Sequence, residues 1–312
     1  MNLDITPTPL DNYYLFKSCT AGSVYPGIEI SVKYVLDVME VDYIDDPRQS
    51  SCSGSGVYTG VVPIETAMAL NARNFSLAAE TENQNIVCVC PMSYNNLKHC
   101  QKLISKEKKL EKQFSTMLKK MGRKYDCTPE VSHISDAFLA LQSSIAEKAV
   151  CSLSGVKAVT HHGCHYSKFF FKDVKSGTFE KPTVLDEILK GFECKVIDYS
   201  EQFLCCGGGV HRSVSDREYP RGILRRKLAS IAEAMPDVIV TQCPGCTFNL
   251  EYYQESLMEE LNMSERIPVL YISELLALLL GAEPEDIGID MHAVPVEPFL
   301  EKFSIGGKND LG

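Results

Sequence analysis

The sequence lacks a hydrophobic run long enough to cross a bilayer. Its most apolar stretch, residues 267–281, carries Glu274 and is shorter than the roughly 20 apolar residues that a spanning helix needs. The N-terminus has neither a basic start nor an apolar core region, so no secretory signal is predicted. We therefore expect no membrane span, and we expect residues 267–281 to form a buried helix.

Positive charge is also scarce. The chain has 31 Lys and Arg against 41 Asp and Glu, a formal net charge of −10. Binding to nucleic acid requires clustered basic side chains that neutralise phosphates, so the sequence argues against a nucleic-acid partner. The one basic stretch, residues 106–120, is interrupted by Glu107 and Glu111 and is typical of a solvated helix face.

The glycine fingerprint of a dinucleotide-binding loop is missing too. Gly54-Ser55-Gly56 has two of the glycines but lacks the third. That third glycine is the one that lets the following helix pack closely on the strand. The sequence therefore predicts no flavin or nicotinamide site. If the protein is redox-active, its electrons must come from, or go to, other proteins of a complex.

Cysteine, by contrast, is abundant, with 13 in 312 residues. Thiols at this density form disulfides in exported proteins, but a chain that is 45% hydrophobic can bury a large core without them. We predict a reduced, cytoplasmic protein. Five of the cysteines follow a pattern in the second half of the chain: Cys164, then Cys205-Cys206-Gly207-Gly208, then Cys243-Pro244-Gly245-Cys246.

Five thiolates exceed what the simpler cysteine sites use. A structural zinc takes four ligands and a thioredoxin-like site takes one Cys-x-x-Cys pair. The adjacent Cys205 and Cys206 point in divergent directions, so both can bind only an extended acceptor with several metal corners. The following glycines let the backbone approach bulky sulfides closely. Soft thiolates select iron–sulfur clusters or zinc, and the surplus cysteine favours iron.

The first half contains an incomplete copy of this pattern. The matches are Cys19 to Cys164, Ser51-Cys52 to Cys205-Cys206, and Cys90-Pro91-Met92-Ser93 to Cys243-Pro244-Gly245-Cys246. Cys52 and Cys206 are 154 positions apart and Cys90 and Cys243 are 153 apart, so Ser51 and Ser93 stand where the second copy has cysteine. Cys88 precedes Cys90 by two residues on the same strand face. A second metal site would therefore use Cys19, Cys52, Cys88 and Cys90.

Hydrophobic patterning predicts an α/β fold with two similar halves. Strands alternate with helices in both, and the predicted elements are strands 13–16 and 41–44 around helix 28–39, then strands 156–159, 195–197 and 238–240 with helices 183–189 and 222–235. These are Rossmann-like βαβ units. The cysteines follow the carboxyl ends of strands, the edge where ligands bind in open α/β sheets.

Together these motifs resemble the B subunit of heterodisulfide reductase, a family with two cysteine-rich CCG domains. The resemblance covers most of residues 13–285 and extends to Tyr94-Asn95-Asn96-Leu97-Lys98 and Pro268-Val269-Leu270-Tyr271. It implies a first CCG lobe with a degenerate motif in residues 1–140, a second with the complete motif in residues 141–285, and a C-terminal extension, residues 286–312, that docks on a partner or frays.

The resemblance also implies a cofactor and partners. The complete motif, Cys164, Cys205, Cys206, Cys243 and Cys246, would hold an unusual noncubane 4Fe-4S cluster, and the first motif would hold a second iron–sulfur cluster or none. Partners would be a flavoprotein like the A subunit of that family and an iron–sulfur protein like its C subunit. The serines of the first motif favour a paralogue from a heterodisulfide reductase-like complex of sulfur oxidation over the methanogen enzyme.

Three functions remain open. The first is an oxidoreductase subunit in sulfur metabolism that acts on a disulfide, persulfide or protein-bound thiol at the cluster. The second is a pure electron-transfer subunit, of the methanogen, succinate/fumarate or lactate/glycolate type; the third is a zinc-bearing assembly protein. His165 and His211 flank ligand-bearing turns and are candidates for proton delivery, although loop-filling is the commoner role and is expected for His161 and His162.

Overall fold

Two parallel four-stranded sheets of identical topology form the protein, which is described here from a computed structural model. The structure describes residues 8–50, 52–83, 85–126, 128–170, 174–208, 216 and 218–305. The first sheet has the order β2-β1-β3-β4 and the second the order β6-β5-β7-β8. The strands are β1 (Tyr13–Phe16), β2 (Tyr43–Ile44), β3 (Asn85–Cys88), β4 (Glu130–His133), β5 (Lys157–His161), β6 (Lys195–Val196), β7 (Val238–Thr241) and β8 (Val269–Tyr271). The predicted α/β fold with two repeated lobes is confirmed.

The repeat extends to strand register. In the first sheet Tyr13 pairs with Asn85, and in the second Ala158 pairs with Val238, which are their counterparts in the sequence repeat. Strands β1 and β7, one in the centre of each sheet, are buried along their whole length, as expected for parallel strands covered by helices on both faces.

Helices connect the strands in both lobes. The first lobe contains α1 (Cys19–Val24), α2 (Pro26–Val38), η1 (Ser55–Val57), α3 (Ile64–Ala79), α4 (Pro91–Lys106), α5 (Lys108–Lys120) and α6 (Ile134–Lys148). The second contains α7 (Cys164–Ser167), α8 (Val184–Lys190), α9 (Glu218–Ala234), α10 (Pro244–Tyr252), α11 (Gln254–Leu261) and α12 (Ile272–Leu279), followed by η3 (Ile289–Met291) and α13 (Glu297–Ile305). In α5 only Phe114 and Leu118 are buried, so the basic stretch has the expected solvated face.

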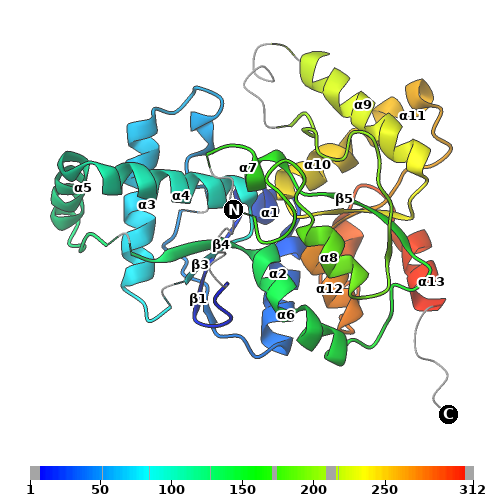
Figure 1. Ribbon diagram of the computed structural model, residues 1–312, viewed down its shortest axis with the longest axis horizontal. Coiled ribbons are helices and arrows are strands. Elements are labelled where there is room, and N and C mark those ends of the chain that lie inside the picture. The colour runs from blue at the N-terminus through cyan, green and yellow to red at the C-terminus, as the bar shows by residue number, and fades with distance from the viewer. Residues whose placement is uncertain are drawn as a thin grey trace.

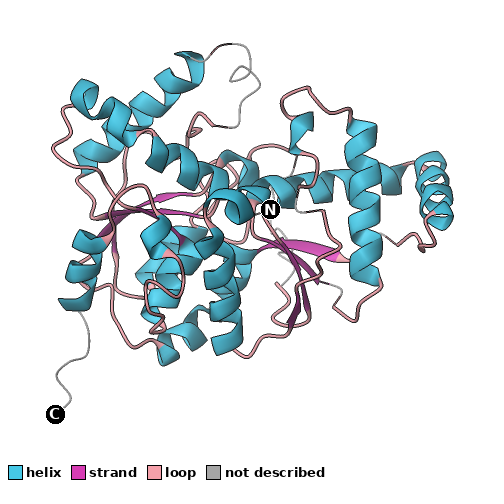
Figure 2. Cartoon of the chain, turned by 180° about the vertical axis from the view of Figure 1, so that it is seen from behind, coloured by secondary structure: helices cyan, strands magenta, loops and turns pink. Residues whose placement is uncertain are grey.

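The two lobes meet through helices that correspond to one another. Helix α2 of the first lobe packs on α12 of the second, and α6 packs on α8; all four lie in the middle of the molecule in Figures 1 and 2. In the repeat α2 corresponds to α8 and α6 to α12, so the interface has approximate two-fold symmetry. The buried Ser31 and Ser273 hydroxyls hydrogen-bond across it at 2.7 Å, and the Tyr271 hydroxyl donates to the Val89 carbonyl oxygen at 2.7 Å.

Two sequence expectations need adjustment. Residues 267–281 do not form one helix, because Val269–Tyr271 pair with β7 as strand β8 before α12 begins. The division predicted between residues 140 and 141 falls inside α6, and we propose to move it to the loop before β5.

The C-terminal extension docks on its own chain as far as the structure describes it. The side chains of Val294, Val296 and Phe299 are buried. The His292 ring lies between two carboxylates, with Nδ1 3.0 Å from Glu251 Oε1 and Nε2 3.2 Å from Glu274 Oε1. Within the described residues, no helix has the length and apolar character that a bilayer crossing requires.

Candidate metal centre

The complete cysteine motif lies where strands of the second sheet end. Cys164 begins α7, three residues after β5, and Cys243 is the N-cap of α10, two residues after β7. Pro244 occupies the first turn of α10, a position where its missing N–H costs no hydrogen bond. Cys205 and Cys206 lie in the loop between β6 and α9. The prediction that cysteines follow carboxyl ends of strands is therefore confirmed.

The five thiols of this motif form one continuous chain of sulfur contacts. Cys164 adjoins Cys205, Cys205 adjoins Cys206, Cys206 adjoins Cys246, and Cys246 adjoins Cys243, closely enough for each thiol to shift the pKa of the next. Contact with Cys164 and Cys206 lowers the pKa of Cys205, and contact with Cys205 raises the pKa of Cys164. Gathered thiolates repel one another, so this arrangement requires bound protons or a cationic group such as a metal cluster.

Glycine backbone encloses these sulfurs. Gly163 has φ +75°, and a Cβ on it would lie 3.2 Å from Cys243 Cβ and 3.6 Å from Cys246 Sγ. Gly207 has φ +94°, and its N–H donates to Cys205 Sγ at 3.3 Å. Both positions favour glycine on backbone grounds, and Gly163 leaves the space next to two sulfurs open. The donor set and this glycine cradle fit an iron–sulfur cluster.

The first lobe does not reproduce the chain of sulfur contacts. Cys19 adjoins Cys52, as Cys164 adjoins Cys205. Cys90 instead contacts Cys243 of the other lobe. Cys88 is fully buried in the hydrophobic core that surrounds β3 and is the counterpart of Thr241 in the register of the sheets. The structure therefore places Cys88 in the role of a core residue.

The register of the first motif also differs from the sequence alignment. Asn249 Nδ2 donates to the Cys206 carbonyl oxygen at 2.5 Å, and Asn96 Nδ2 donates to the Ser53 carbonyl oxygen. Gly54 and Gly207 share a positive φ, +89° and +94°. Asn96 and Asn249, Ser53 and Cys206, and Gly54 and Gly207 are therefore corresponding residues, and in each case the two are 153 positions apart. Cys52 is thus the counterpart of Cys205 and the buried Ser53 that of Cys206; the pairing of Cys52 with Cys206 was wrong by one residue.

Of the described histidines near the motif, His161 takes a position different from the one expected. His161 lies beside the sulfurs, because one of its ring nitrogens and the sulfurs of Cys206 and Cys246 all lie within 4.8 Å of one another. His162 accepts a hydrogen bond from the Leu185 N–H at 3.1 Å, which is a structural role. His165 Nδ1 is 3.5 Å from Cys164 Sγ, so it adjoins the site as predicted. His211 lies outside the described residues.

A buried lysine accompanies His161. Lys227, on α9, is fully buried, and its Nζ is 3.4 Å from His161 Nδ1 and donates to the Glu201 carbonyl oxygen. Burial lowers the pKa of Lys227 to about 8, although the nearby cysteine thiolates favour its charged form. Neither residue is placed at the sulfurs by the sequence patterns: His161 is expected to fill a loop, and one lysine in an amphipathic helix is ordinary.

A cavity of about 1150 Å³ connects the two motifs. It is lined by Cys19, Cys52 and Cys90 of the first lobe and by Cys243 of the second. Phe248, Tyr252 and Tyr253 form an aromatic wall, with Phe248 and Tyr252 stacked at 5.1 Å between ring centroids. Arg221 and Arg266 also line the cavity. It is large enough for a small organic molecule, and it brings sulfur atoms from both lobes to one space.

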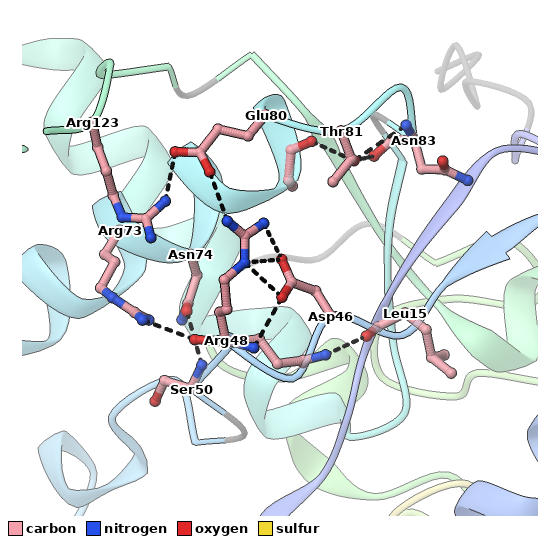
Figure 3. A network of polar contacts seen from close by, with 12 residues as sticks. Leu15, Asp46, Arg48, Ser50, Arg73, Asn74, Glu80, Thr81, Asn83 and Arg123 are labelled. Atoms are coloured by element: carbon pink, nitrogen blue, oxygen red, sulfur yellow. Dashed lines mark hydrogen bonds and ion pairs between the residues drawn. The ribbon is translucent and has the colours of Figure 1, made fainter.

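Polar contacts fix the loop that carries Cys52. Figure 3 shows Arg48 between Asp46 and Glu80, and Arg73 donating to the Arg48 carbonyl oxygen at 2.8 Å. The Ser50 N–H donates to Asn74 Oδ1 on α3. Gln49 contacts the segment before Cys19, with Nε2 donating to the Leu15 carbonyl oxygen at 2.8 Å and Oε1 accepting from the Lys17 N–H at 2.9 Å. These contacts hold the Cys52 loop against the end of β1.

Comparison with known proteins agrees with this arrangement. The cysteine-rich domain family CCG matches residues 13–98 and 158–251, one stretch in each lobe. The B subunit of the ferredoxin:CoB-CoM heterodisulfide reductase of Methanosarcina acetivorans is 31% identical over 93% of this chain and 96% of that protein. The chain belongs to the family of heterodisulfide reductase B subunits and their relatives, and it carries the CCG domain twice.

Two further comparisons show lower identity. The 8-methylmenaquinol:fumarate reductase membrane anchor subunit of Wolinella succinogenes is 28% identical over 90% of this chain and 96% of that protein. A crystal structure of a hypothetical protein from Helicobacter pylori superposes on 94% of this chain with a TM-score of 0.66 at 15% identity. This chain spans 53% of the length of that solved chain; the likeness concerns the fold alone.

Proposed function

We propose that this protein is the iron–sulfur subunit of a heterodisulfide reductase-like complex. Cys164, Cys205, Cys206, Cys243 and Cys246 hold a noncubane 4Fe-4S cluster. The observation that carries the proposal is the continuous contact chain of five thiols, which exceeds the needs of zinc. When bound, such a cluster supplies one-electron transfer and a thiophilic iron.

The proposed substrate is a disulfide, persulfide or protein-bound thiol in sulfur metabolism. Three features support a sulfur substrate: the cavity reaches Cys243 of the complete motif, it is lined by further thiols, and its volume accommodates a small organic disulfide. The name of the Methanosarcina relative, which refers to a heterodisulfide, agrees with this class. We propose a reducing, cytoplasmic location because the described cysteines are free thiols.

The chain's own residues contribute charge and proton handling at this site. Buried Lys227 places a cation near Cys205, Cys206 and Cys246, which offsets the negative charge of the thiolates. His165 adjoins Cys164 and is the described histidine placed to exchange a proton there. Electrons would pass to or from two partners, one resembling the flavoprotein A subunit of the family and the other its iron–sulfur C subunit.

A pure electron-transfer subunit is the second candidate. Ser53 and Ser93 replace two sulfurs of the first motif, so this chain has one complete motif instead of two. The fumarate reductase relative also agrees with a role in relaying electrons. Addition of small disulfides or thiols to the reduced protein distinguishes the two candidates: a changed electron paramagnetic resonance spectrum supports a catalytic site, and an unchanged spectrum supports electron transfer.

The first test is metal content. We expect anaerobically purified protein to contain about four irons and four sulfides per complete motif and Cys206→Ala to lose most of both, because it removes a central member of the contact chain. Cys194→Ala is the matched control, since Cys194 is buried in the same lobe but contacts the Val156 carbonyl oxygen. Zinc without iron, or full iron in Cys206→Ala, contradicts the proposal.

A further inference from the structure

The first lobe retains a pair of contacting thiols after the loss of its cluster ligands. In the second lobe the sulfur chain runs through Cys205, Cys206 and Cys246. In the first lobe serines occupy the positions of the last two, Ser53 and Ser93, and both are buried. A hydroxyl is a poor ligand for iron in such a cluster. The series of contacting sulfurs is therefore interrupted in the first lobe at two successive positions.

The thiols that remain in the first motif lie in two separate places. Cys19 and Cys52 contact each other, whereas Cys90 contacts Cys243 across the approximate two-fold axis. Cys88, the fourth predicted ligand, is enclosed in the core. The first lobe thus offers a pair of thiols and a separate single thiol, instead of four convergent ligands.

The pair faces the cavity. Both Cys19 and Cys52 line it; Cys19 is exposed and Cys52 is partly buried. Ser55 Oγ is 3.4 Å from Cys52 Sγ, and Gln49 and Ser50 tie the Cys52 loop to β1 and α3. Two sulfurs in contact, held by fixed backbone and open to a substrate-sized space, are the arrangement that thiol–disulfide exchange needs.

We propose that Cys19 and Cys52 form a redox-active dithiol that exchanges with a disulfide substrate in the cavity, in place of a second cluster. This inference rests on the proposed sulfur substrate. One thiolate of the pair attacks one substrate sulfur, a mixed disulfide forms, the substrate S–S bond breaks, and one substrate thiolate leaves with the electron pair. The other sulfur of the pair then attacks the cysteine sulfur of the mixed disulfide, so that the Cys19–Cys52 disulfide forms and the second substrate thiolate leaves.

The exchange is balanced by a reductive step. The substrate disulfide has gained two electrons, and its two thiolates take up the two protons lost from Cys19 and Cys52. Regeneration of the dithiol requires two electrons and two protons, with the electrons supplied singly by a reduced one-electron carrier protein of the ferredoxin class and the protons by solvent.

The test uses the full chain and oxidised glutathione as the disulfide. Trypsin places Cys19 in the peptide 18–33 and Cys52 in the peptide 49–73, and neither contains another cysteine. After anaerobic reaction with the iron-loaded protein, we expect mass spectrometry to find these two peptides cross-linked, at about one cross-link per chain, with iron content unchanged. Cys52→Ser should accumulate Cys19 as its glutathione adduct, because the resolving thiol is missing.

Iron content separates this inference from a second cluster. We expect Cys19→Ser and Cys52→Ser to keep the iron of the parent protein, and Cys151→Ser, a partly buried thiol outside the cavity, to keep both the iron and the cross-link. Loss of about half of the iron in Cys19→Ser and Cys52→Ser overturns the dithiol, as does the absence of the cross-link in the parent. If Cys206→Ala keeps its iron while the cross-link forms, the proposed cluster at the complete motif fails and the dithiol stands.

Discussion

At the scale of single residues, one of the attachments of the C-terminal extension is a buried cation. His292 lies between Glu251 and Glu274, and the Tyr25 hydroxyl donates to Glu251 from the first lobe. Burial alone would lower the pKa of His292, but the two carboxylates raise it to about 10. The imidazolium therefore joins the extension, α10 and α12, with Tyr25 adding a contact from the other lobe.

Removal of this cation should destabilise the whole chain. We expect His292→Leu to lower the free energy of unfolding at pH 7 by about 3–5 kcal/mol, because it leaves two buried carboxylates without a positive partner. Urea unfolding followed by circular dichroism measures this. Glu285→Gln, on the exposed surface of the preceding loop, is the control and should change stability little.

The pH dependence of this effect has a definite sign. Since the folded-state pKa of His292 lies above its ordinary value of 6.5, its contribution is complete below pH 6.5 and is lost as the pH rises through about 10. The stability difference between the parent and His292→Leu should therefore be largest at about pH 6.5 and just below, and should shrink steadily as the pH rises from 6.5 towards 10. A difference that stays constant over this range contradicts the ion pairs.

At the scale of elements, the Cys52 loop depends more on backbone contacts than on surface charge. The Gln49 amide satisfies a carbonyl oxygen and an N–H of the segment that leads to Cys19. The ion pairs of Arg48 lie nearer to solvent, and its side chain is 49% exposed. Exposed ion pairs contribute little to stability, whereas unpaired buried polar groups are costly.

Two substitutions in this loop should therefore differ. We expect Gln49→Ala to cost about 1–3 kcal/mol of stability and to slow formation of the Cys19–Cys52 cross-link, because the two loops lose their shared anchor. Arg48→Met should change both quantities only slightly. Equal effects of the two substitutions in urea unfolding and in the cross-linking rate would show that the surface ion pairs position the loop.

At the scale of the whole molecule, the lobes share one interface core. Leu275, Leu276 and Leu279 of α12 are fully buried, and α2 of the first lobe packs on this helix. A chain cut to residues 149–312 loses α2 and α6 and exposes the apolar faces of α12 and α8. Burial of these faces adds to the separate core that the second lobe has around Leu228, Ile239 and Leu250, and its loss removes apolar area that stabilises the lobe.

We therefore expect the full chain to unfold by urea in one cooperative transition and the 149–312 chain to show none, with dye-binding hydrophobic surface exposed at low urea. The comparison requires circular dichroism and a hydrophobic dye on both chains at equal concentration. A sharp transition in the shorter chain would mean that each lobe folds independently and that the interface forms afterwards.

Local features of this protein follow from its amino-acid sequence alone. The five-cysteine motif, the incomplete first copy and the βαβ alternation are properties of neighbouring residues and of periodicity, so sequence patterns suffice to predict them. His165 beside Cys164 was predictable for the same reason, since the two are adjacent in the chain. The one-residue error in pairing Cys52 arose because serines and glycines around it allow two alignments.

Which sulfurs meet depends instead on tertiary packing. The contact of Cys90 with Cys243 spans two lobes, and it depends on how α2 and α6 pack on α12 and α8. Cys88 faces the core instead of the cavity, and His161 reaches Cys206 and Cys246 because the strand register places it there. Such contacts are fixed by packing between residues distant in the chain, which no local spacing encodes.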